Sequence, residues 1–507
     1  MFQRRYILLL FCASSCMVAG QHELRQDRNP FFLQHLQKDN PYRNTVAQVR
    51  THGFLPNEEK EFVTNRSKFL KSQVENIVGY EISDEQVPRI AVSGSGGGYR
   101  AMISLIGFLE GAQLSSLPIT YLAGVSGATW CIMPWLASGQ SITDFKNSLF
   151  PTLDHGLLQI SQARDINDVT LLLLKKWMFG QPITFVDIYG SVLSYNLLAD
   201  QQRNSLHGTL APRIRDGLYP LPIGCALGGD NKNPYYWFEF SPFEVGSPEL
   251  NSYIPTWAFG RGFDKGSSVD FAPEQTLGYF LGVFGAAFAE SEYKDFFDEL
   301  LHKLREKNQA ILSSIVNQIL KDRNRKDVGG GKVHNFMHGL DSNPLTNVEN
   351  LMFIDAGIIF DEARGVGANV PLLPFYRKER AVDIIIVVDA SSNAGSAGEL
   401  GNALDYVRKL GYVVPEVDYV KAGESVITTW YPVDNGPIII YMPNIKNEQY
   451  SPDFDPRDIT QVYNTFNFKY SLEQAQKLSD LISYNVQQSK DTIYQVIRNV
   501  VARNSNA

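Results

Sequence analysis

The sequence predicts an α/β fold, a three-layer sandwich in which helices cover both faces of a central, largely parallel sheet. Residues 89–137 read as two consecutive strand, glycine turn and helix units, and such units build parallel sheets. Later strand-like runs are almost entirely apolar, as expected for strands buried on both faces. The 507 residues are 44% hydrophobic and 20% charged, a composition that excludes a disordered chain.

The two units share one pattern: a short apolar run, then glycines, then apolar residues at helical spacing. The predicted elements are strand 89–93, loop 94–98 and helix 100–113, followed by strand 119–123, turn 124–127 and helix 128–137. Gly139 is expected to end the second helix, because glycine commonly follows a helix C-terminus.

The rest of the chain is expected to complete the sheet and to cover it. Further strands are predicted at 351–354, 384–388 and 437–441, and closing helices at 471–503. Residues 21–85 are expected to form an N-terminal helical extension to the main domain, 86–507. Within about 140–345 we expect a mostly helical, aromatic-rich cap or lid insertion, with the lid itself in 246–275 or that stretch an ordinary surface loop.

The first twenty residues have the pattern of a secretory signal peptide. Arg4 and Arg5 precede an apolar run that ends at Ala19, with small residues before Gly20. We therefore expect 1–20 to be removed and the protein to be exported, as a secreted, periplasmic or endomembrane-lumen protein; an uncleaved anchor is the alternative. Cys131 and Cys225 would then remain, as one disulfide or as two buried thiols.

The net charge of -8 argues against nucleic acid as a partner, since nucleic-acid binding depends on clustered lysine and arginine.

The second glycine turn has the pattern of a nucleophile elbow. In Gly124-Val-Ser126-Gly-Ala128 a serine stands between glycines, after a strand and before a helix, the context that lifts a hydroxyl above a sheet. Ala128 replaces the last glycine of the usual pattern. The preceding loop, 93–98, has bare backbone N–H groups that could bind an oxyanion, and each such donor contributes about 2.7 to 4 kcal/mol.

Two other interpretations of these segments are weaker. Gly96-x-Gly98-x-x-Ala101 fits a dinucleotide-binding loop, but no acidic residue lies between Glu110 and Asp144 to bind a ribose. His334 and His338 have the spacing of helical zinc ligands, but Asn335 stands where a zinc protease has its glutamate.

A serine nucleophile needs a base, and the histidines make a Ser-Asp-His triad improbable. None follows His338, whereas α/β-hydrolases place the catalytic histidine last. A desolvated carboxylate can take the serine proton directly. Asp355, directly after the 351–354 strand, and Asp389, after the 384–388 strand, are both candidates.

The motifs together resemble the catalytic domain of the cytosolic phospholipase A2 family, related to patatins and fungal phospholipase B. The segments that carry the resemblance are 93–102 (SGSGGGYRAM), 123–130 (AGVSGATW), 186–190, 237–246, 282–288, 355–357, 369–371 and, less securely, 465–468. The likeness extends from about residue 85 to the C-terminus.

The resemblance implies a role for each candidate residue. Ser126 is the nucleophile, Asp355 its base, Gly97 and Gly98 the oxyanion donors, and Arg100 the group that steadies the substrate phosphate, while Asp389 becomes structural.

The implied reaction is hydrolysis of fatty-acyl esters of phospholipids or lysophospholipids at a membrane or micelle interface, with no metal or organic cofactor. An acyltransferase and a non-catalytic lipid-binding protein remain alternatives. The aromatic run 235–238 would line an acyl channel or belong to the core.

Overall fold

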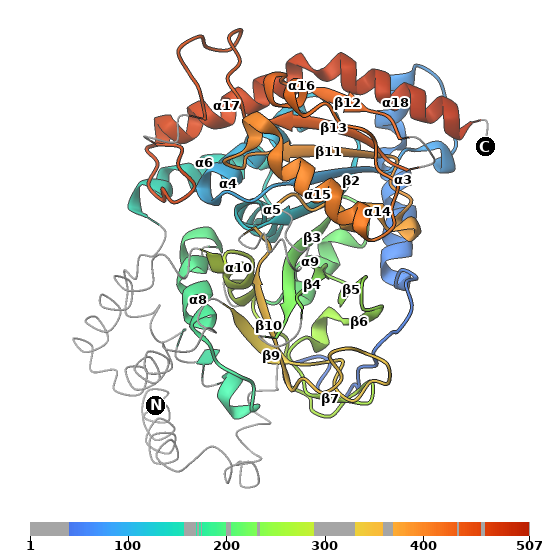
Figure 1. Ribbon diagram of the computed structural model, residues 1–507, viewed down its shortest axis with the longest axis vertical. Coiled ribbons are helices and arrows are strands. Elements are labelled where there is room, and N and C mark those ends of the chain that lie inside the picture. The colour runs from blue at the N-terminus through green and yellow to red at the C-terminus, as the bar shows by residue number, and fades with distance from the viewer. Residues whose placement is uncertain are drawn as a thin grey trace.

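The protein is built around an 11-stranded sheet with helices on both faces (Figure 1). The computed structural model describes residues 40–156, 169, 172–173, 175–198, 204–230, 234–287, 330–357, 369–432, 436–457 and 462–505. Residues 1–20, interpreted above as a signal peptide, lie outside the described residues.

The strands and helices expected at 89–137, 351–354, 384–388, 437–441 and 471–503 form near those bounds, and the described part of the chain contains further elements. The helices are α3 (Asn57–Val78), α4 (Gly98–Leu114), α5 (Gly127–Ser138), α6 (Ile142–Leu149), α8 (Phe185–Leu198), α9 (Leu206–Ile214), α10 (Leu277–Phe284), α14 (Leu373–Tyr376), α15 (Gly398–Lys409), α16 (Tyr419–Glu424), α17 (Leu472–Gln488) and α18 (Lys490–Asn504). The strands are β1 (Ile90–Gly94), β2 (Ile119–Val125), β3 (Leu221–Gly229), β4 (Tyr236–Phe240), β5 (Glu244–Ser247), β6 (Ser252–Pro255), β7 (Phe263–Asp264), β8 (Ser267–Ser268), β9 (Gly331–His334), β10 (Asn350–Asp355), β11 (Ile384–Asp389), β12 (Thr428–Trp430) and β13 (Ile438–Pro443).

The centre of the sheet is parallel, which confirms the predicted fold class. The strand order is β12-β13-β11-β1-β2-β3-β4-β5-β6, and the run from β13 to β3 is parallel throughout. Antiparallel strands extend both ends of this run. Because β1 and β2 are neighbours, the glycine turns that follow them lie at the same edge of the sheet.

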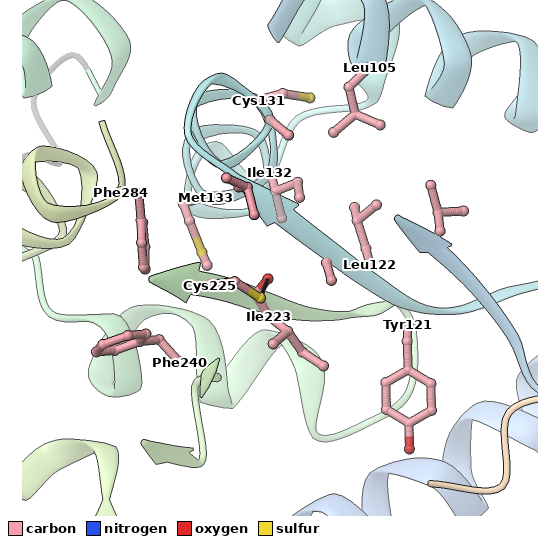
Figure 2. Close-up of a cluster of buried hydrophobic side chains, with 14 of the residues drawn as sticks. Leu105, Tyr121, Leu122, Cys131, Ile132, Met133, Ile223, Cys225, Phe240 and Phe284 are labelled. Atoms are coloured by element: carbon pink, nitrogen blue, oxygen red, sulfur yellow. Dashed lines mark hydrogen bonds between the residues drawn. The ribbon is translucent and has the colours of Figure 1, made fainter. Parts of the chain in front are cut away.

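The two faces of the sheet are covered by different helices, and two consecutive residues of β2, Tyr121 and Leu122, point to opposite faces. Leu122 points toward the side covered by α4 and α5, whereas the Tyr121 ring lies on the other side (Figure 2). There the Tyr121 ring contacts Phe62 of α3 and Phe375 of α14. This alternation is what a strand buried on both faces requires.

Cys131 of α5 and Cys225 of β3 are both buried free thiols in this core, so no disulfide joins them (Figure 2).

A cluster of buried charges ties the N-terminal helix to the sheet. Glu239 of β4 accepts hydrogen bonds from Arg377 (2.9 Å) and Arg380 (2.6 Å), and Arg380 also donates to Glu59 of α3 (2.8 Å). All four side chains are at least 95% buried. Helix α3, in the segment expected to be an extension, therefore shares the core of the main domain.

Two segments differ from the sequence-based expectation. The insertion expected within about 140–345 to be mostly helical supplies strands β3 to β6 and β9 of the central sheet. The stretch 246–275, expected as a lid or an ordinary surface loop, includes β6 and is tied to the chain near residue 45: Arg261 donates to the carbonyls of Tyr42 and Thr45. Backbone pairing to distant strands cannot be inferred from local composition.

Across the described ranges, no helix is both long and apolar enough to cross a membrane.

Candidate active site

Strand pairing brings Ser126 and Asp355 together at one edge of β3. Strand β2 pairs with β3 up to Val125, opposite Cys225, and Ser126 follows at once. Strand β10 pairs with β3 from Gly229 down to Ala226, which lies opposite Asp355. Since β4 occupies the other edge of β3, β2 and β10 meet end to end along the same edge. The antiparallel direction of β10 places its carboxyl end beside the elbow.

Ser126 occupies a strained turn of the kind expected for a nucleophile. Its φ is 50° and its ψ is -123°, a conformation that L-residues rarely adopt. Gly127 is needed next to it, because a Cβ there would lie 2.1 Å from the carbonyl oxygen of Gly98 and 2.8 Å from its nitrogen. The elbow and the first glycine loop thus touch backbone to backbone.

Gly97 and Gly98 bring their backbone amides to this contact. Both have positive φ, 144° and 61°, and Gly98 begins α4. The first N–H groups of a helix have no intrahelical acceptor, and no hydrogen bond from either amide is present within the described part of the chain. The amides and the positive end of the α4 dipole can therefore stabilise a negative charge beside Ser126.

Asp355 is a buried carboxyl with no cationic partner among the described residues. Its side chain has no solvent exposure, and desolvation raises its pKa to about 7. Hydrogen bonding from Gly357 N–H, the Ser126 hydroxyl and Ala287 N–H lowers this pKa, but less than burial raises it. Oδ1 accepts from Gly357 N–H at 2.8 Å, while Oδ2 has no partner of standard hydrogen-bond geometry among the described residues. One oxygen is thus available to receive a proton.

Arg100 lies beside the glycine loop but is not exposed. Only 2% of the residue is accessible, and burial lowers its pKa. Its guanidinium donates to Ala390 O (2.7 Å), Tyr463 O (2.7 Å) and Thr465 Oγ1 (2.9 Å). The side chain therefore fastens the C-terminal 465–468 motif to the start of α4.

Asp389, the other candidate base, is placed differently. Both of its carboxylate oxygens are occupied: Oδ1 accepts from Ser391 N–H at 2.8 Å and Oδ2 from the Tyr441 hydroxyl at 2.7 Å. These contacts fit the structural role that the resemblance implied.

Asn369 was singled out in a motif without a role, and the structure places it between the two halves of the site. Its Oδ1 accepts from Gly96 N–H at 3.0 Å. A Cβ at Gly357 would lie 2.6 Å from the same oxygen.

The aromatic run 235–238, by contrast, is mainly core: Trp237 and Phe238 have no exposure.

The family model described as lysophospholipase catalytic domain matches residues 90–414. The chain belongs to this lysophospholipase family. The match confirms the resemblance inferred from the motifs.

Named relatives agree with the family assignment. A Mus musculus protein, cytosolic phospholipase A2 zeta, is 26% identical over 551 residues, covering 89% of this chain. The chain covers 62% of that relative, less than two thirds of its length.

Solved structures show the same fold. Human GIVD cytosolic phospholipase A2 aligns with a TM-score of 0.73 and 21% identity over 90% of this chain and 68% of its own. The same human protein in complex with methyl gamma-linolenyl fluorophosphonate aligns with a TM-score of 0.70 and 21% identity, over 91% of this chain and 66% of its own.

The expectation of export by a signal peptide is wrong. The relatives of this lysophospholipase-family chain are cytosolic phospholipases A2, which points away from a secreted protein. The interpretation of residues 1–20 depended on composition alone, and a short apolar run after two arginines is not specific enough to outweigh the relatives.

Proposed function

We propose that this protein hydrolyses fatty-acyl esters of phospholipids or lysophospholipids through a Ser126–Asp355 dyad. The observation that carries the proposal is the meeting of β2 and β10 along β3, which brings a strained serine beside a buried carboxyl. One oxygen of this carboxyl has no partner of standard hydrogen-bond geometry among the described residues. Family membership supports an acyl-ester substrate, and the human relative has been solved with a fluorophosphonate, a reagent class that modifies nucleophilic serines.

The proposed reaction has two halves. In the first, Ser126 Oγ attacks the acyl carbonyl carbon while its proton passes to Asp355, and the Gly97 and Gly98 amides bind the oxyanion. Collapse of this intermediate breaks the ester bond, and the leaving alcohol takes the proton from Asp355. In the second, Asp355 accepts a proton from water as the water attacks the acyl-enzyme. Collapse of the second oxyanion breaks the bond between the acyl carbon and Ser126 Oγ, and Oγ takes the proton back from Asp355 as the fatty acid leaves.

The mechanism requires Asp355 to be ionised when it acts as a base. Its pKa of about 7 is suited to this task, because a base is most effective when its pKa lies near the working pH. We expect kcat/KM to fall about tenfold per pH unit below about pH 7, and a pH–rate profile on a soluble monoacyl phospholipid measures this. An acid limb near the usual aspartate pKa would contradict the assignment of Asp355.

Arg100 is proposed to steady the substrate phosphate, as the resemblance implied, with two of its five N–H groups. The other three donate to Ala390, Tyr463 and Thr465.

The protein is proposed to bind its substrate at a membrane or micelle surface, where such lipids aggregate.

One experiment tests reaction, nucleophile and substrate together. The protein is incubated with a diacyl and with a monoacyl phospholipid, with and without a chelator, and the released fatty acid is measured. In parallel, a fluorophosphonate probe is applied and the modified peptide is identified by mass spectrometry. We expect turnover that a chelator does not change and labelling of Ser126 that is absent in Ser126→Ala; full turnover by Ser126→Ala would end the proposal.

A further inference from the structure

The side-chain amide of Asn369 fills the space between two glycines of the site. A Cβ at Gly96 would lie 2.2 Å from Asn369 Oδ1, and one at Gly357 would lie 2.6 Å from it. Neither glycine could carry a side chain while this amide is in place. Two turns that are distant in the sequence therefore close upon one oxygen atom.

Each of these turns leads directly to a reacting group. Gly96 precedes the oxyanion donors Gly97 and Gly98, and a Cβ on Gly96 would lie 3.1 Å from the Cβ of Ser126. Gly357 donates its N–H to Asp355 Oδ1 at 2.8 Å. A shift of the Asn369 amide would thus move both the loop that carries the Gly97 and Gly98 amides and the turn that holds the Asp355 carboxyl.

The orientation of the amide and of its segment is determined by hydrogen bonds. Gly96 N–H points to both Asn369 Oδ1 (3.0 Å) and Asn369 O (3.1 Å), so the oxygen end of the amide must face the loop. The following segment is held as well, because Ser93 Oγ donates to Pro371 O at 3.0 Å. Asn369 is in this way anchored to the end of β1.

We propose that Asn369 is a positioning residue, which keeps the glycine loop 93–98 and the turn 355–357 at a fixed separation around Ser126. This inference rests on the proposed function, and it adds a residue whose contacts act through Gly96 and Gly357 rather than on the substrate. An asparagine suits this place because its oxygen is an acceptor without a charge. An aspartate would put a second carboxylate beside Asp355.

The test compares Asn369→Ala with Asn335→Ala as a matched control. Asn335 also joins loop segments through its side chain, donating to Leu345 O and Val348 O and accepting from Met337 N–H, but it lies beyond the opposite end of β10. The concentration of active sites is titrated with a fluorophosphonate, and kcat and KM are measured on a monoacyl phospholipid. Hydrogen exchange is followed in peptides that contain residues 93–98 and 355–357.

We expect Asn369→Ala to lower kcat per titrated site about 10- to 100-fold with little change in KM, because displacement of reacting groups by about 1 Å has effects of this size. Hydrogen exchange should rise in both peptides. Asn335→Ala should change neither kcat nor the exchange of these peptides. Asn369→Asp, which keeps an acceptor for Gly96, should recover part of kcat at alkaline pH with its acid limb moved to higher pH.

The proposal is overturned by a kcat of Asn369→Ala near that of the wild type, by an equal loss in Asn335→Ala, or by unchanged exchange in either peptide. Failure of the proposed function looks different. In that case the wild type neither turns over lipid nor reacts with the probe, while a rise of exchange in both peptides of Asn369→Ala would still support the positioning role.

Discussion

Two buried carboxyl groups flank β3, and their surroundings shift their pKa values in opposite directions. Glu239 lies opposite Cys225 on one edge of the strand, and Asp355 lies opposite Ala226 on the other edge. Consecutive residues of a strand face opposite sides of the sheet, so the two carboxyls are on different faces. Both are almost completely removed from water.

The difference between them is the presence of cations. Burial raises the pKa of Glu239, but the charges and hydrogen bonds of Arg380 and Arg377 lower this pKa by more than burial raises it. The net shift is therefore downward. Among the described residues, Asp355 has neutral hydrogen-bonding groups alone to offset the same burial, and its pKa rises to about 7. Each carboxyl keeps one oxygen without a partner among the described residues, so that feature alone does not distinguish them. A buried acid becomes a base near neutral pH when charged partners are kept away from it.

Exchange of each carboxyl for its amide should separate catalysis from stability, and the largest effect is expected at Asp355. Asp355→Asn and Ser126→Ala should each lower kcat by about 10⁴-fold or more, because each removes a group that acts in every turnover. Asp389→Asn, the matched control at the end of β11, should retain kcat. Steady-state kinetics on a monoacyl phospholipid measure all three variants. An active Asp355→Asn would show that turnover needs the Asp355 carboxyl no more than the Glu239 carboxyl.

Glu239→Gln should instead damage the fold. It leaves the buried guanidinium groups of Arg377 and Arg380 without their shared carboxylate, and breaking a buried pair in this way costs about 3 to 5 kcal/mol. Denaturant unfolding measures the loss, and kcat per folded molecule should stay close to the wild type. A large loss of kcat with unchanged stability would show that the charge cluster acts in the reaction.

The stability of the protein should depend on pH through Asp355. Its folded pKa of about 7 lies above the ordinary value of 3.8, so the folded state keeps a proton that the unfolded state releases between these values. Stability is therefore lost as pH rises through this window. Asp355→Asn removes this loss, and above about pH 7 it should be more stable than the wild type by about 1 to 4 kcal/mol. Thermal unfolding across this pH range checks the sign; a less stable variant at high pH would contradict it.

The smallest effect is expected from Thr465→Val, which tests how firmly the Arg100 guanidinium is held by its three acceptors. The variant removes one acceptor of the Arg100 guanidinium, and we expect a stability loss of about 1 to 2 kcal/mol. The two backbone acceptors should hold the side chain, so the acid limb of the pH–rate profile should not move. A displaced acid limb would contradict this expectation.

The elements that contain both members of the dyad could be predicted from local pattern. The glycines around Ser126 and the apolar run before Asp355 are short-range signals, and the strands and helices formed near the expected residues. The fold class followed from the two consecutive strand, turn and helix units. The candidate site residues Ser126, Gly97 and Gly98 are brought together because the turns after β1 and β2 lie side by side.

Other features depend on contacts between residues far apart in the sequence. Nothing in the composition of β10 says that it runs antiparallel to β3, although this direction places Asp355 beside Ser126. The pairing of Glu59 with Arg380 and the burial of Arg100 are equally non-local. Asn369 was visible only as part of a motif, because an asparagine between two glycines becomes informative once all three meet in space.

The end-to-end arrangement of β2 and β10 has a consequence for how this site tolerates change. A single residue inserted into β10 would advance its register by one, and a strand shifted by one residue turns every side chain to the opposite face. The carboxyl at its end would then project to the face on which Glu239 meets Arg377 and Arg380, and the proposed dyad would be lost. The chemistry of the protein is thus encoded in the parity of one short strand as much as in the identity of its last residue.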